Sequence, residues 1–300
     1  MSRTNIRTIF LLTACTLTLW SCGGAGGEEA ENEDQFTEED ASGLVNEGEK
    51  VVYYGTPSLV EVASIMESSG AEFTPELLND PEASINYSTN NSKALNLGVY
   101  GADLAYAAMF KHTQESINYL KTVKGMAEDL GMSGAFETEL LATIETNINN
   151  RDSLLDLVTD FYWSADAYLQ DNDRSNVAAL IIAGGWMESM YLACNMSSIS
   201  PNNGEIKTKI AEQKLILKNL VLFMEDAAKG DQGVIDMNEK LKELQKIYEG
   251  IEITQETGVV ETQESGGETV IANETTVNVN NTVLMELCAK FGEIRNEIVK

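Results

Sequence analysis

Positive charge is scarce in this 300-residue chain, which has 20 Lys and Arg residues against 48 Asp and Glu residues and a single histidine. The formal net charge is −28. A surface this negative repels phosphate backbones and anionic lipid headgroups, so we expect no nucleic-acid partner and no membrane attachment through a basic patch. One histidine also excludes a His-rich zinc enzyme and a ferritin-type di-iron bundle, which needs two Glu-x-x-His pairs.

Sequence signatures of common enzyme classes are missing as well. The chain contains no phosphate-binding loop, no dinucleotide-binding fingerprint and no recognisable Ser-His-Asp set. A segment that begins at Asp171 starts like a calcium-binding loop. Its sixth position is Asn176 where an EF-hand has Gly, and its twelfth is Ile182 where an EF-hand has Glu. We therefore predict no cofactor and favour a protein that is not an enzyme.

The first 21 residues have the layout of a secretory signal peptide. Arg3 and Arg7 give the segment a positive start, and a largely apolar stretch follows at residues 9–20. That stretch is shorter than the roughly 20 apolar residues that a membrane-spanning helix needs. A positive start followed by a short apolar stretch predicts a signal that is removed from the mature protein.

The signal ends on four residues that resemble the lipobox of bacterial lipoproteins, Leu19-Trp20-Ser21-Cys22. The motif has an aliphatic residue three positions before the cysteine and a small residue directly before it. Trp20 is bulkier than usual at the tolerant position between them. The resemblance implies that Cys22 becomes the first residue of the mature chain, with a diacylglyceryl thioether and an acylated amine. Because several acyl chains make a stable anchor, the lipid bilayer is the expected partner of Cys22; an ordinary secreted protein cut near Ser21 is the alternative.

Residues 22–50 are expected to form a flexible acidic linker. Five small residues follow Cys22, and residues 28–49 contain ten acidic residues and no basic one. Such a block repels itself and remains disordered, so it would act as a spacer. An acidic cluster soon after the lipidated cysteine also resembles the surface-export signal of some Gram-negative lipoproteins. Neither Gly23 nor Gly24 is the Asp that favours retention at the inner membrane. We therefore expect the outer membrane, with the periplasmic and the cell-surface face both open.

Residues 51–300 predict an all-α bundle of about eight helices that resembles uncharacterised helical envelope lipoproteins. Apolar residues recur at helical spacing, and Gly and Pro mark several helix ends. Residues 251–281 break this pattern, and we favour a disordered insert there over a β-hairpin. The last helix is expected to return and pack on the body. The expected helices lie between Thr56 and Gly70 and at about 92–110, 113–130, 133–149, 152–169, 174–194, 205–228, 234–249 and 282–299.

Two of these helices are apolar almost all round, and each carries an acid followed three residues later by a tyrosine. The pairs are Asp103 with Tyr106 and Glu188 with Tyr191. Asn96 and Tyr100 share a face with Asp103 at helical spacing. Glycines stand before each acid in both helices; a mid-helix Gly costs about 1 kcal/mol relative to Ala, so we expect the two backbones to approach closely there. These glycines are Gly98, Gly101, Gly184 and Gly185.

An unpaired buried carboxylate is costly, so Asp103 and Glu188 need partners. We favour a buried hydrogen-bond network that fixes the register of the two helices. The alternative is a polar pocket in which Asp103, Tyr106, Glu188 and Tyr191 bind a small molecule or a cation, with carboxylates able to support hydrolase-like chemistry. The sequence leaves the identity of any metal open.

Cys194 and Cys288 are the cysteines that remain once the signal is removed and Cys22 is acylated. In an oxidising envelope they would be able to form a disulfide that ties the last helix to helix 174–194. Two buried free thiols are the slightly favoured interpretation. Taken together, the sequence predicts a membrane-anchored envelope lipoprotein with a binding or structural role, and another envelope protein is its candidate partner.

Overall fold

The computed structural model describes residues 59–135, 150, 159–160, 164–200, 202–257, 273–278 and 280–300. Several predictions concern residues outside these ranges: the signal peptide, Cys22, the acidic linker, the helix start at Thr56, the helix at 133–149 after residue 135, and most of residues 152–163. The described residues all belong to one unit, Glu47–Lys300.

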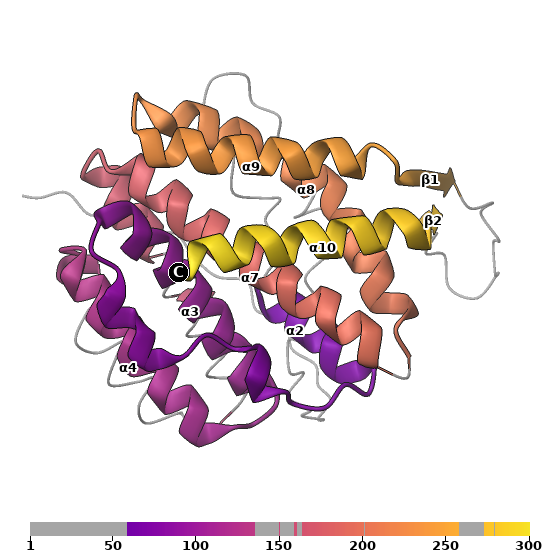
Figure 1. The fold of residues 1–300 in the computed structure, drawn as a ribbon, viewed down its shortest axis with the longest axis horizontal. Coiled ribbons are helices and arrows are strands. Elements are labelled where there is room, and N and C mark those ends of the chain that lie inside the picture. Colours follow the sequence, from indigo (N-terminus) through magenta and orange to yellow (C-terminus); the bar gives the residue numbers. More distant parts are fainter. Residues whose placement is uncertain are drawn as a thin grey trace, which may run out of the picture. The chain divides into compact units, whose positions relative to one another are not determined.

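The described residues form an all-α bundle, as the sequence predicts (Figure 1). Residues 164–171 are helical as well, and most observed helix ends lie within a few residues of the expected positions. The helices with printed bounds are α2 (Leu59–Ser68), α3 (Asn90–Met109), α4 (Thr113–Asp129), α7 (Ser175–Ile199), α8 (Gly204–Ala228), α9 (Gln232–Tyr248) and α10 (Asn281–Ile298).

Local sequence signals explain where these helices begin and end. Thr89 starts α3 with a capping box, in which its hydroxyl accepts the N–H of Ser92 and the Ser92 hydroxyl accepts the N–H of Thr89. Gly70, Gly131 and Gly230 follow α2, α4 and α8 with φ values of 76°, 69° and 90°. Glycine adopts this left-handed conformation without a steric penalty, so it ends a helix cleanly.

Helices α3 and α7 form the centre of the bundle, and their backbones nearly touch. A Cβ atom at Gly98 would lie 2.0 Å from the carbonyl oxygen of Ile181, and one at Gly184 would lie 2.0 Å from that of Leu95. The predicted close approach is confirmed. Of the described helices, α7 alone has the length and hydropathy of a membrane span, but 89% of its most apolar window is buried inside the bundle.

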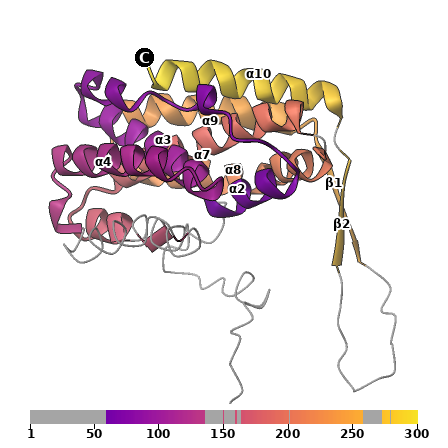
Figure 2. The same ribbon diagram turned by 90° about the horizontal axis from the view of Figure 1, so that it is seen from below.

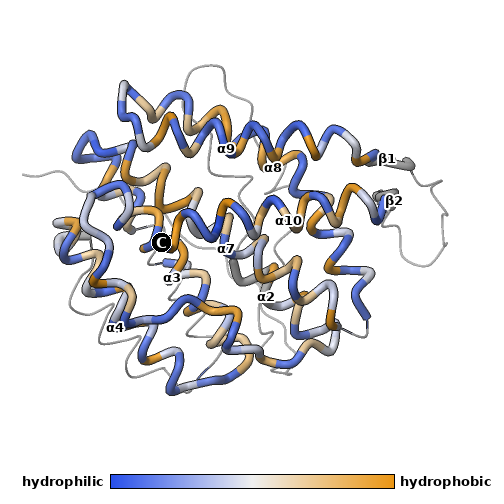
Figure 3. Tube along the Cα trace, viewed as in Figure 1, coloured by the Kyte–Doolittle hydropathy of each residue, from blue (hydrophilic) through white to orange (hydrophobic). Residues whose placement is uncertain are grey.

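The helices around this centre are amphipathic. Figure 3 shows hydrophilic and hydrophobic residues alternating along α9 and α10. The buried stripe of α10 packs on α7 and α9, which confirms that the last helix returns to the body. That stripe consists of Leu284, Leu287, Phe291, Ile294 and Ile298.

Asp231 joins the N-terminal ends of three helices. Its carboxylate accepts hydrogen bonds from the side-chain amides of Asn91 in α3 and Asn176 in α7, at 2.7 and 2.8 Å. It also caps α9 by accepting the N–H groups of Gly233 and Val234. Burial acts to raise the pKa of Asp231, but these hydrogen bonds outweigh it and lower the pKa below its usual value.

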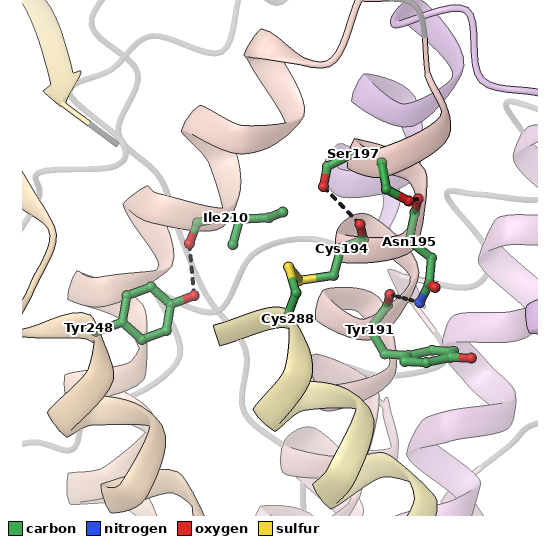
Figure 4. Close-up of a disulfide and its surroundings, with 8 residues drawn as sticks. Tyr191, Cys194, Asn195, Ser197, Ile210, Tyr248 and Cys288 are labelled. Carbon is green, nitrogen blue, oxygen red and sulfur yellow. Dashed lines mark hydrogen bonds between the residues drawn. A yellow bond between two sulfur atoms is a disulfide. The ribbon is translucent and has the colours of Figure 1, made fainter. Parts of the chain in front are cut away.

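A disulfide links the central helix α7 to α10. Cys194 and Cys288 are bonded, with their Cα atoms 5.3 Å apart, and Figure 4 shows the bridge running from α7 to α10. The favoured interpretation of two free thiols is therefore wrong, and the alternative, a disulfide between these cysteines, is confirmed. The residues alone did not decide the pairing, because it depends on how α10 packs against α7 at a sequence separation of 94.

Two short strands flank part of the segment between α9 and α10. Strand β1 (Glu252–Thr257) pairs with β2 (Asn273–Asn278) in an antiparallel ladder that runs from Glu252 opposite Asn278 to Thr257 opposite Asn273 (Figure 2). The disorder predicted for residues 251–281 is wrong for these two segments, whose Thr and Val content favours extended backbone. Residues 258–272 lie outside the described residues.

Candidate functional site

A polar stripe on α3 faces the connector between α2 and α3, which comprises residues 69–89, and the end of α10. At the start of the stripe, the Asn96 side-chain amide donates to the carbonyl oxygen of Ile298 at 2.8 Å. One turn later, the Tyr100 hydroxyl donates to the carbonyl oxygen of Asp80 at 2.7 Å. Both side chains are fully buried. The first half of the stripe therefore holds backbone groups of two other segments.

Asp103 binds the same connector through Asn79. The backbone N–H of Asn79 donates to Oδ2 of Asp103 at 3.1 Å, and its carbonyl oxygen accepts the Tyr119 hydroxyl at 3.0 Å. Its side-chain amide donates to the Tyr87 hydroxyl at 3.0 Å. Asn79 thus has its backbone and side chain fixed by three different residues, one of which belongs to α4.

Tyr106 completes the stripe at the other end of the connector. Its hydroxyl accepts the backbone N–H of Thr74 at 3.2 Å and contacts the sulfur of Met196 at 3.6 Å. Its ring stacks on Phe73, with the ring centroids 5.3 Å apart. Like Tyr100 and Asp103, Tyr106 holds the connector.

Glu188 of α7 is paired with Arg295 of α10. The guanidinium binds both carboxylate oxygens, Nε to Oε2 at 2.9 Å and Nη2 to Oε1 at 3.2 Å. Nη2 also donates to the carbonyl oxygen of Leu77 in the connector at 3.4 Å. The guanidinium carbon lies 4.7 Å from the centre of the Tyr191 ring, a cation–π arrangement. Arg295 thereby joins α7, α10 and the connector.

The structure brings Asp103 and Glu188 together, and both side chains are 0% exposed. The two carboxyl groups are close enough for each to affect the pKa of the other. Burial and the neighbouring Glu188 raise the pKa of Asp103 well above its usual range, although the Asn79 N–H and Arg295 act in the opposite direction. Burial also raises the pKa of Glu188, and Arg295 opposes this shift.

Of the four predicted site residues, Asp103 and Glu188 meet directly and Tyr191 joins them through Arg295. Tyr106 instead contacts the far end of the connector. Within the described ranges, no three His, Cys, Asp or Glu side chains come together in a way that would hold a metal ion. Protein groups occupy the positions around the two acids, which is the arrangement expected of a network that fixes helix register.

Sequence reasoning missed several members of this network, Arg295 and Asn79 among them. Arg295 had a recognisable signal, because it lies four residues after Phe291 and three before Ile298 and so falls beside the apolar stripe of α10. A basic residue at that position indicates a buried acidic partner. Asn79 had no such signal, since its contribution to Asp103 is a backbone N–H in an irregular segment.

A comparison of the chain with protein-family models, curated proteins and solved structures finds no match.

Proposed function

We propose that this protein is a lipoprotein of a bacterial cell envelope, anchored in a membrane by acyl chains on Cys22, with a helical body that has a binding or structural role. The observation that carries the proposal is the sequence Leu19-Trp20-Ser21-Cys22 at the end of a signal-like segment. The acidic linker after it would separate the body from the membrane surface. Gly23 and Gly24 favour the outer membrane, with either the periplasmic or the outer face.

The disulfide between Cys194 and Cys288 supports export. Disulfides persist in oxidising compartments such as the bacterial periplasm and are rare in the cytosol, where thiols are kept reduced. A chain that is exported and then anchored would acquire this bond after it crosses the inner membrane.

The packing around Asp103 and Glu188 supports a non-enzymatic role. A catalytic carboxyl group must reach a substrate within hydrogen-bond distance, whereas both of these side chains are 0% exposed and already face protein groups. The polar network joins α3, α7, α10 and the connector, and so it stabilises the body. An envelope protein that binds this body is the proposed partner.

The proposal is tested by expressing the full chain in a Gram-negative host with and without an inhibitor of lipoprotein signal peptidase. We expect the inhibitor to accumulate a precursor that retains residues 1–21, and labelled fatty acid to appear in the wild-type protein. Cys22→Ser should lose the label. Cys15→Ser, a second cysteine of the signal segment, is the matched control and should keep it. Normal processing in the presence of the inhibitor, with no label on the wild-type chain, would overturn the proposal.

A further inference from the structure

The contacts of Asp103 leave one of its oxygens without a donor. Oδ2 accepts the Asn79 N–H, while Oδ1 is buried and meets no hydrogen-bond donor among the described residues. The carboxyl of Glu188 neighbours that of Asp103 and raises its pKa, and Glu188 has no hydrogen to donate when it is ionised. Two adjacent carboxylates cannot satisfy each other unless one of them carries a proton.

The charges around this pair lead to the same conclusion. Among the described residues, Arg295 is the positive group that acts on both acids, and it binds both oxygens of Glu188. The hydroxyls of Tyr100, Tyr119 and Tyr191 are neutral, since burial raises the pKa of each. Asp80 of the connector acts on Tyr100 and Tyr119 and adds no positive charge. With both acids ionised, the cluster would therefore keep an uncompensated negative charge in a fully buried position, which is strongly unfavourable.

We propose that Asp103 carries a proton that it donates from Oδ1 to Glu188, and that loss of this proton as the pH rises loosens the connector and the end of α10 from the core. In the protonated form, Asp103 donates to Glu188, Glu188 accepts from Arg295, and the cluster is neutral. Ionisation removes the hydrogen bond and places two carboxylates against each other. This is a pH-sensitive contact that is independent of the anchor at Cys22.

The geometry determines which segments respond. Asn79 and Leu77 belong to the connector, and both bind members of the cluster. Arg295 lies near the end of α10, whereas Cys288, about two turns earlier and near the middle of the helix, is covalently bonded to Cys194. Ionisation of Asp103 should therefore release the connector and the last two turns of α10, while the disulfide keeps the middle of α10 in place.

Asp103→Asn is the decisive variant, because Asn keeps an oxygen for the Asn79 N–H and supplies a permanent N–H donor for Glu188. The protein is the full chain with its disulfide intact, and the measurement is hydrogen-exchange protection, corrected for the intrinsic exchange rate, as the pH is raised from roughly 4. A group whose pKa is raised in the folded state contributes stability that is complete below its unfolded pKa, about 3.9 for Asp, and is lost as the pH rises. Because one proton is involved, the ratio of the connector's protection factor in the wild-type protein to that in Asp103→Asn should fall tenfold per pH unit until Asp103 ionises.

Asp129→Asn is the control, since Asp129 is an exposed acid paired with Lys93 and its removal should leave the pH dependence as in wild-type. An infrared carbonyl band of a protonated carboxylic acid should also be present in the wild-type protein at neutral pH and absent from Asp103→Asn. The wild-type spectrum decides the matter even if the variant does not fold. Absence of that band, or equal pH dependence of protection in wild-type and Asp103→Asn, would overturn the proposal.

Discussion

Replacing Gly98 or Gly184 by alanine tests the close contact between α3 and α7. At both positions the new Cβ would lie 2.0 Å from a backbone carbonyl oxygen of the opposite helix. Ordinary contact requires about 3.4 Å, so the helices would have to move apart by more than 1 Å, and no side-chain rotation relieves a clash with backbone. Overpacking of a core typically costs about 1–3 kcal/mol, against a gain of about 1 kcal/mol from replacing Gly by Ala inside a helix. We expect each variant to lose up to about 2 kcal/mol of unfolding free energy.

Gly125→Ala is the matched control for these variants. Gly125 also lies inside a helix, α4, but a Cβ there would have nothing within 4 Å. The helix-propensity gain is then unopposed, so this variant should be stabilised by about 0.5–1 kcal/mol. Urea unfolding followed by far-ultraviolet circular dichroism, with the disulfide intact, measures all three. If Gly98→Ala and Gly184→Ala are stabilised like Gly125→Ala, the helices do not approach as described.

Two further predictions concern contacts between distant segments. Replacing Cys194 and Cys288 together by serine should lower the unfolding free energy, by up to about 4.7 kcal/mol if the disulfide acts by restricting the unfolded chain. Urea unfolding of the double variant and of the oxidised wild type measures the difference. Equal midpoints would show that the disulfide adds no stability. Asp231→Ala should lower the unfolding free energy by about 1–2 kcal/mol because α9 loses its N-terminal cap. Loss of the hydrogen bonds to Asn91 in α3 and Asn176 in α7 should lower it further. Because hydrogen bonds lower the pKa of Asp231, its contribution is present above the usual Asp pKa and is lost as the pH falls. The difference in melting temperature between the variant and the wild type should therefore shrink as the pH is lowered from 7 to 3. A difference that stays constant would contradict this explanation.

Much of the fold was predictable because it depends on local signals. The apolar character of α3 and α7, the glycines that bring them together and the caps that bound several helices are all visible in the sequence. The same signals placed Asp103 and Glu188 in one network, because two central helices in close contact bring their buried acids near each other. Local chemistry and global packing agree here.

The remaining features depend on contacts between distant segments. The partner of Glu188 is Arg295, 107 positions later, and the partner of Asp103 is a backbone N–H of Asn79. Neither pairing follows from helical periodicity. Free thiols and a disordered insert were favoured over the disulfide and the β1–β2 ladder for the same reason: both features need the path of the chain in space, which composition and spacing do not give.

The most direct test of the proposed lipoprotein is the mass of the N-terminal peptide from the mature protein, purified from the membranes of an expressing Gram-negative host. The account predicts a peptide that begins at Cys22 and carries the mass of the thioether-linked diacylglyceryl group and the amide-linked acyl chain. A mature protein that retains residues 1–21, or that begins at an unmodified residue, would contradict it.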